Sequence, residues 1–276
     1  MSAGILLALA SALVWGSGDY CGGRAARRHD PFQVLVLASI AGIAMLTAAA
    51  LARGEAWALD TALGWAAAAG LAGALGIASL YQGLAIGSAA AVAPTAAVVA
   101  AGVPVLFTAA TTGLPGPLQT IGFAVALTGI WLVARAAPVG PASRMGIRLG
   151  LLAGVGFGGF LILIAQVDAA SVFVPLSVAR AMMLAVGLLV VARRHSLLPA
   201  PASNPLALVA GLLDAGGNVL YLLARQHVRL DIAAVLSSLY PVATVLLARV
   251  VSHEPVTPTQ WVGAGICLAA VGLIAV

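Results

Sequence analysis

The chain has 276 residues, of which 62% are hydrophobic and only 8% are charged, whereas a soluble domain carries about 25% charged residues. So few charges cannot cover the surface of a water-soluble fold of this size, which excludes most soluble enzymes and nearly all disordered proteins. The apolar residues recur in stretches of about 20, the length that a helix needs to cross about 30 Å of hydrocarbon. The composition therefore predicts an all-α, multi-pass membrane protein that contacts the lipid bilayer.

The net charge of +5 does not indicate a nucleic-acid partner. All 13 basic residues are arginines, which stand singly or in short groups between apolar stretches, so no long basic face forms. Such arginines are typical of anchors at span ends and of topology signals. The two cysteines, Cys21 and Cys267, lie far apart without metal or redox spacing. We therefore expect no metal, no cofactor and no nucleic acid.

Ten apolar stretches are long enough to be spans, and their short connections make neighbouring helices antiparallel. The expected spans are 3–23, 32–52, 61–85, 89–112, 117–135, 146–166, 172–193, 205–225, 231–251 and 258–276. Four helix starts are predicted where a capping residue precedes a proline, because such a cap satisfies a free backbone N–H and the proline loses no hydrogen bond. These pairs are Asp30-Pro31, Gly116-Pro117, Asn204-Pro205 and Thr257-Pro258.

The chain also repeats itself. Tyr81–Gly122 resembles Tyr221–Gly263, since each begins with tyrosine, places a proline inside a span and ends in a Pro-x-Gln-x-x-Gly element. The matched internal prolines are Pro104 and Pro241. We therefore divide the chain into two five-helix halves, 1–136 and 145–276, joined by a Pro/Gly/Ser linker at Ala136–Ser143.

Five spans are an odd number, so a tandem second copy inserts upside down. Such inverted repeats with interrupted helices at matched positions are typical of secondary transporters, whose substrate sites lie near the membrane midplane between the halves. A proline inside a helix frees a carbonyl and permits a kink. We interpret Pro104 and Pro241 as hinges, and a static bend is the alternative.

Several elements in this order resemble an EamA-type carrier of the drug/metabolite transporter superfamily. They are Trp15-Gly16, the segments at Tyr81 and Tyr221, Pro104, Leu239-Tyr240-Pro241, and the tail His253–Gly263 with its Glu254, Thr257, Gln260 and Gly263. The first half departs from the pattern because Gly113 stands where the second half has Glu254. Any role that needs both glutamates is therefore in doubt.

The resemblance implies ten helices around a central cavity and the export of amino acids or other small metabolites. Transport would proceed by alternating access, without enzyme chemistry, and we expect a location in the bacterial inner membrane. The sequence leaves open the substrate, the direction of transport, and whether the chain is a monomer or a homodimer. Orientation is also open, because alternate loops hold nine and three arginines, and the richer side implies termini outside, whereas related carriers are described with termini inside.

Ionisable residues at membrane depth are costly and usually functional. Arg180 and Asp214 fall at similar depth on adjacent antiparallel spans, and Asp19 lies towards the end of the first. Two interpretations of Arg180 stay open. It forms a structural pair with Asp214, which avoids two isolated charges, or it binds a substrate carboxylate with its planar fork.

A polar stripe continues along the eighth span. Asp214, Asn218 and Tyr221 are spaced i, i+4 and i+7 and share one helix face. Such a face lines the cavity or packs against another helix, because it cannot face lipid. One hypothesis is that Asp214 exchanges a proton, which would couple transport to a pH gradient, and facilitated diffusion is the alternative.

Four further residues complete the expected substrate site. Trp15 and Asp19 are four residues apart on the first span, and Tyr81 and Gln82 lie on the third. Aromatic rings can form an apolar wall or a cation–π contact with an ammonium group. By contrast, Gly150, Gly154 and Gly158 form a small-residue face, which we interpret as helix packing.

Two other functions are compatible with a multi-pass membrane protein. A lipid or polyprenyl-carrier flippase would have a cavity open sideways to lipid. An intramembrane enzyme would need a convergent acid–base or nucleophilic cluster, and neither such a cluster nor a catalytic or nucleotide-binding motif is present. The sequence therefore favours a secondary carrier.

Overall fold

A computed structural model describes residues 3–57, 61–86, 89–135, 144–167, 171–195, 197 and 200–275. Within these residues the structure is helical and has no strand. The elements are α1 (Ala3–Ala26), α2 (Pro31–Arg53), α3 (Thr61–Ile86), α4 (Ala89–Thr112), α5 (Pro117–Ala134), α6 (Arg144–Ile164), α7 (Phe173–Arg193), η1 (Pro201–Ser203), α8 (Pro205–Arg225), α9 (Leu230–Ser237), α10 (Tyr240–Ser252) and α11 (Pro258–Ile274). The expected linker Ala136–Ser143 lies outside the described residues.

The helices have the length and composition of membrane spans. In the described part of the chain, nine segments are long and apolar enough to cross a bilayer, one of them being α9 and α10 taken together, Leu230–Ser252. The shorter apolar helix α11 occupies the tenth expected position. The prediction of an all-α membrane protein is therefore confirmed.

Two of the four predicted caps form as expected. The side chain of Asp30 accepts a hydrogen bond from the Phe32 backbone N–H at 2.9 Å, and the Thr257 Oγ1 accepts one from Gln260 N at 3.3 Å. Asn204 makes no such cap. Its Nδ2 instead donates to the Ala25 carbonyl oxygen at 3.1 Å, which ties α8 to the end of α1. Gly116 has no side chain to cap with, and its carbonyl accepts from the hydroxyl of Thr120.

The two matched prolines behave differently. α4 continues as one helix through Pro94 and Pro104, so Pro104 does not break its helix, and its role as a hinge stays a prediction. The ninth span breaks between α9 and α10, immediately before Pro241. Proline has no N–H to donate to the Ser237 carbonyl. The chain instead forms i→i−3 hydrogen bonds there, from Leu239 N to Leu236 O and from Val242 N to Leu239 O.

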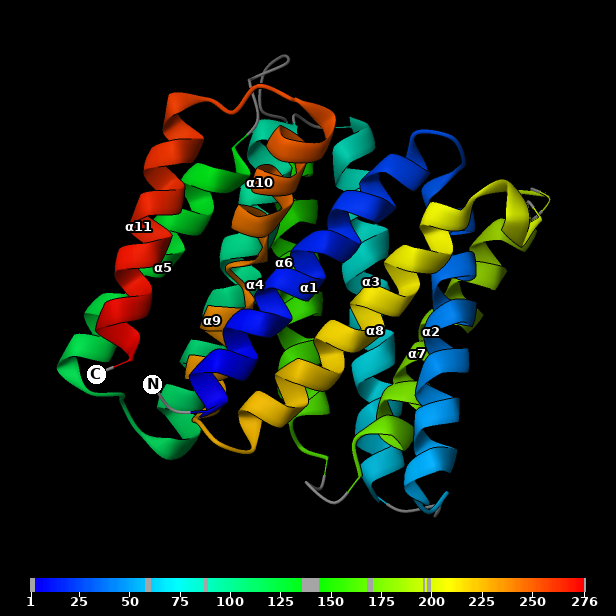
Figure 1. The fold of residues 1–276 in the computed structure, drawn as a ribbon, viewed down its shortest axis with the longest axis horizontal. Helices are drawn as coiled ribbons and strands as arrows, with labels where there is room; N and C mark the ends of the chain where they lie inside the picture. Colours follow the sequence, from blue (N-terminus) through cyan, green and yellow to red (C-terminus); the bar gives the residue numbers. More distant parts are fainter. Residues whose placement is uncertain are drawn as a thin grey trace.

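The helices of the two halves pack on one another in matched pairs. α1 packs on α8 as α6 packs on α3, α2 packs on α8 as α7 packs on α3, and α1 packs on α9 and α10 as α6 packs on α4. α2 also pairs with α7, and α5 pairs with α11 along one edge of the bundle (Figure 1). Each helix of the first half thus has a counterpart in the second: α1 and α6, α2 and α7, α3 and α8, α4 and the pair α9–α10, and α5 and α11. When every helix is replaced by its counterpart, each of these contacts becomes a contact that the structure also contains.

Both chain ends lie at the same end of the bundle (Figure 1), which we call the terminal face. Arg53 and Arg225 end the helices α2 and α8, which run towards this face, and Arg229 lies between α8 and α9, so all three belong to it. The opposite end, called the arginine-rich face, holds nine arginines: Arg24, Arg27, Arg28, Arg135, Arg144, Arg148, Arg193, Arg194 and Arg249.

The glycine face of α6 packs closely against α4. A methyl group at Gly154 would lie 2.5 Å from Val99 Cβ and 2.8 Å from the Ala96 carbonyl oxygen, and Gly150 and Gly158 meet α4 in the same way. On α1, a methyl group at Gly16 would lie 2.6 Å from the Tyr240 carbonyl oxygen of α10. The packing interpretation of these glycines is therefore confirmed.

Candidate functional site

Arg180 and Asp214 form an ion pair across the contact between α7 and α8, with Arg180 Nη2 bonded to Asp214 Oδ2. The Arg180 side chain is 6% exposed and that of Asp214 is 45% exposed. The arginine is thus enclosed by protein, while the carboxylate keeps an open side. The pair lies well inside both helices, seven residues after Phe173 begins α7 and nine after Pro205 begins α8.

Glycine makes room for the guanidinium. A methyl group at Gly42 of α2 would lie 3.4 Å from Arg180 Nε and 3.2 Å from the Gly211 carbonyl oxygen. The backbones of α2 and α8 also approach closely where Gly211 meets Ala38. Three helices, α2, α7 and α8, therefore fix the position of Arg180.

The backbone carbonyl of Asp214 joins two further expected site residues. It accepts hydrogen bonds from Asn218 Nδ2 at 2.7 Å and from Trp15 Nε1 at 3.2 Å. The Trp15 ring stacks on Tyr221, with centroids 6.0 Å apart, and meets Tyr240 edge-on at 6.4 Å. α1, α8 and the start of α10 thus build an aromatic wall one turn away from the ion pair.

Tyr221 is completely buried, and its hydroxyl donates to the Leu161 carbonyl oxygen of α6 at 2.9 Å. This bond satisfies the phenolic O–H inside the protein, as a buried tyrosine requires. The ring of Tyr221 therefore serves the aromatic wall, and its hydroxyl ties α8 to α6.

The remaining expected residues lie farther towards the arginine-rich face. Asp19 is exposed and lies one helical turn from Trp15, close enough to Asp214 and Tyr81 for their charges to interact. Tyr81 packs edge-on against Phe32, with centroids 5.5 Å apart. Gln82 is exposed on α3. The structure thus clusters Arg180, Asp214, Asn218, Trp15 and Tyr221, with Asp19 beside them and Tyr81 and Gln82 at the margin.

The enclosed side of Arg180 borders only a very small space in this conformation. Among the described residues, the space beside Arg180 and Asn218 amounts to about 10 Å³, which is roughly the minimum for one water molecule. Phe160, Met183, Leu46, Leu176 and Ala179 complete its walls. A solute can enter this space only when these helices move apart.

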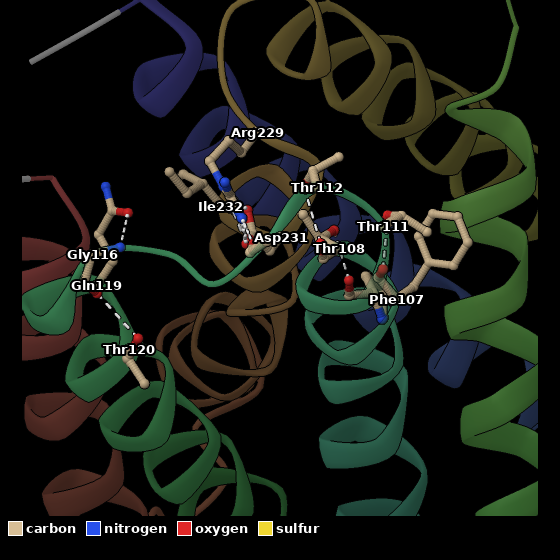
Figure 2. Close-up of polar contacts among 12 residues, drawn as sticks. Phe107, Thr108, Thr111, Thr112, Gly116, Gln119, Thr120, Arg229, Asp231 and Ile232 are labelled. Carbon is tan, nitrogen blue, oxygen red and sulfur yellow. Dashed lines mark hydrogen bonds and ion pairs between the residues drawn. The ribbon is translucent and has the colours of Figure 1, made fainter.

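Two acidic residues at the terminal face have structural roles that the sequence did not suggest. Asp231 at the start of α9 is fully buried, and its carboxylate accepts from Arg229 Nη2 at 3.0 Å and from Ile232 N at 2.9 Å (Figure 2). Arg229 Nη2 also donates to the Gly113 carbonyl oxygen at 2.8 Å. This Arg229–Asp231 clasp ties α9 to the loop between α4 and α5. The hydrogen bond to Asp231, above all, raises the pKa of Arg229 above its usual value.

Glu55 performs the second role. Its carboxylate accepts hydrogen bonds at 2.9–3.0 Å from the backbone N–H groups of Val172, Phe173 and Val174. These are free N–H groups at the start of α7, where the helix dipole also favours a negative charge. A residue from the loop after α2 thus anchors the helix that carries Arg180.

The arginine-rich face is held by contacts between the ends of α1 and α10. The Ser252 Oγ lies 2.5 Å from the Tyr20 hydroxyl and accepts from Arg24 Nη1 at 2.7 Å. Beyond it, Arg27 pairs with Glu254 at 2.8 Å. Polar contacts therefore tie neighbouring helices together at both ends of the bundle.

A family model for the EamA-like transporter family matches residues 2–135 and again residues 144–276. The chain belongs to the EamA-like transporter family. Together with the apolar helices, this membership establishes a multi-pass membrane transporter of the drug/metabolite transporter type, with a small-molecule substrate and the lipid bilayer as its surroundings.

A solved structure described as "Crystal structure of protein" has the same fold as this EamA-like chain. Its TM-score is 0.79 at 19% sequence identity, covering 100% of this chain and 99% of the other. None of the curated proteins matches the chain in sequence. The described residues contain no group of three or more His, Cys, Asp or Glu side chains placed to hold a metal ion.

Proposed function

We propose that this EamA-like protein is a secondary carrier that exports amino acids or similar small solutes, with Arg180 binding the substrate carboxylate. The observation that carries the proposal is the buried Arg180 beside the half-open carboxylate of Asp214. A carboxylate can replace Asp214 on the planar guanidinium without leaving either the arginine or the substrate unpaired.

The groups around this pair suit a solute that carries both charges. When a substrate carboxylate displaces Asp214 from Arg180, the freed Asp214 carboxylate is available to a substrate ammonium group. The Trp15 ring, stacked against Tyr221, offers a face for the same cation. The Asp19 carboxyl group lies next to this pair, on the side towards the arginine-rich face.

Transport would proceed by alternating access between two inverted five-helix repeats, 1–136 and 145–276. The matched helix contacts of the two halves support this arrangement. The Arg229–Asp231 clasp at one face and the Ser252 and Glu254 contacts at the other would open in turn. The break before Pro241 would serve as one hinge, and Pro104 in the unbroken α4 as a bend.

Coupling to protons follows from the same exchange. An Asp214 carboxylate released from Arg180 inside the membrane is costly as a charge, so either a substrate ammonium group or a proton would have to neutralise it. Because only one of the two can occupy the carboxylate, substrate and proton would bind alternately and move in opposite directions. A monomer contains every residue of this site, so the proposal needs no partner subunit.

The test is transport of labelled amino acids into liposomes that contain Arg180→Gln, Asp214→Asn or both substitutions. If the pair is only structural, the double variant restores a neutral buried pair and transports normally. If Arg180 binds substrate, the double variant folds as stably as the unmodified protein but transports at least about tenfold more slowly. That factor corresponds to the loss of one charged hydrogen bond to the substrate. Flux that ignores an imposed pH gradient would contradict proton coupling.

A further inference from the structure

The polar stripe of α8 extends beyond the central cluster to the terminal face. Arg225 follows Tyr221 by four residues, so Asp214, Asn218, Tyr221 and Arg225 share one helix face. Eleven residues separate Asp214 from Arg225, which is about 16 Å along the helix axis. The charge of Arg225 is close enough to Tyr221 to act on it. Arg225 therefore lies at the outer end of a stripe that begins at the Arg180 pair.

A pocket of about 190 Å³ opens at this end of the stripe. It lies between the end of α6, the start of α7 and the end of α8, and most of its lining is apolar. The lining residues are Ala165, Val167, Ser171, Val172, Leu222, Arg225 and Gln226. Pockets for drug-sized ligands measure about 300–1,000 Å³, so this one fits a smaller molecule.

The cation in this pocket has unused bonding capacity. Arg225 Nε is buried and has no hydrogen-bond partner in the described part of the chain. The nearby carboxylate of Glu55 is already engaged by Val172, Phe173 and Val174, so it does not serve as the partner of Arg225. A buried donor without a partner costs free energy, and an anion held on the guanidinium from the pocket side would offset part of that cost.

We propose that this pocket is a second, outer binding site for the carboxylate group of a small organic acid or amino acid. Arg225 holds the carboxylate, and Leu222 and Val172 contact the apolar part. The site receives or releases solute at the terminal face, one step away from Arg180. Only the choice of ligand rests on the proposed function, because the charge and the cavity do not depend on transport.

A cysteine in the pocket can report its charge without a known substrate. Ser171→Cys is introduced after Cys21→Ser and Cys267→Ala remove the native thiols. Its reaction rate with an anionic methanethiosulfonate is divided by its rate with a cationic one of similar size. Arg225→Gln should lower this ratio about tenfold, because the guanidinium attracts one reagent and repels the other. Arg53→Gln removes an exposed arginine from the same face and should leave the ratio unchanged.

Three probes of similar shape then test the ligand class. Leucine and 4-methylpentanoate carry a carboxylate, whereas 3-methylbutylamine does not. The first two should slow labelling of residue 171 in the Arg225 protein, and Arg225→Gln should abolish this protection. Equal protection by the amine, protection that survives Arg225→Gln, or an unchanged rate ratio would each overturn the proposal. If Ser171→Cys does not fold, Ala165→Cys lines the same pocket and gives the same readout.

The central site and the outer pocket can fail separately. Arg180→Gln should stop transport and leave the protection at residue 171 intact. Protection without transport of any carboxylate would contradict the proposed function and support the outer pocket. Normal amino acid transport in Arg225→Gln with an unchanged labelling ratio would contradict the pocket alone.

Discussion

The indole ring of Trp15 lies directly against the backbone of Gly217. A methyl group at Gly217 would come within 2.6 Å of Trp15 Nε1 and 2.8 Å of Cγ, distances that no carbon atom tolerates without displacement. The absence of a side chain on α8 therefore allows the ring to reach the Asp214 carbonyl and to stack on Tyr221.

Gly217→Ala should destabilise the protein by about 1–3 kcal/mol, because the added methyl group forces Trp15 off its hydrogen bond and its stacking partner. The neighbouring Gly216→Ala is the matched control. Its methyl group would meet only Val14, at 3.7 Å, and alanine favours the helix by up to about 1 kcal/mol. Thermal unfolding in detergent micelles should separate the two variants, and equal midpoints would show that the Trp15 contact is unimportant.

The helices could be predicted from sequence because a bilayer fixes their length and their composition. Arg180 and Asp214 could be found because charges at membrane depth are rare and their positions imply adjacent helices. Arg225 could also have been found, four residues after Tyr221 on the same face. An arginine in the last turn of a span is also typical of an end anchor, so its position alone does not distinguish a binding residue from an anchor.

Other features depend on distances that no local pattern contains. Glu55 contacts the start of α7 more than 110 residues away, and a loop glutamate is indistinguishable in sequence from a solvated one. Asp231 is fully buried only because Arg229 and the N-terminus of α9 satisfy it. Pro104 and Pro241 look equivalent in sequence, yet only one ends a helix, because packing against neighbouring helices decides whether a proline is tolerated.

Glu55→Gln should weaken the anchoring of α7. The carboxylate serves three backbone N–H groups with both oxygens, and the amide retains only one acceptor and no charge. We expect a loss of about 2 kcal/mol in unfolding free energy. Glu254→Gln is the control, because its pair with Arg27 is exposed, with side chains 42% and 65% accessible, and such pairs contribute about 0–1 kcal/mol. Chemical denaturation that ranks Glu254→Gln as the more damaging change would contradict this role.

Asp231→Ala should free α9 from the loop between α4 and α5. The substitution leaves Arg229 without its carboxylate and removes the acceptor for Ile232 N, at a cost of about 2–3 kcal/mol. Hydrogen exchange should become faster at Gly113 and Leu230–Ser237.

In the unmodified protein the Arg229–Asp231 clasp should persist from pH 7 to 10. Arg229 is a base whose pKa rises on folding from an already high value. Such a base stabilises the fold at every pH below the pKa that it has in the unfolded chain, and this range includes pH 7 to 10. Opening of the clasp within this range would contradict the assignment.

Pro241→Ala should join α9 and α10 into one helix. Alanine supplies the missing N–H, which can donate to the Ser237 carbonyl. Continuous i→i−4 hydrogen bonding can then replace the i→i−3 hydrogen bonds at Leu239 and Val242. Hydrogen exchange over residues 234–244 should therefore slow, and transport should slow with it if the break is a hinge. Pro104→Ala is the matched control, since α4 is already continuous there and exchange around residue 104 should change less. Slower exchange at 234–244 with an unchanged transport rate would establish the break as static and remove Pro241 from the moving parts of the carrier.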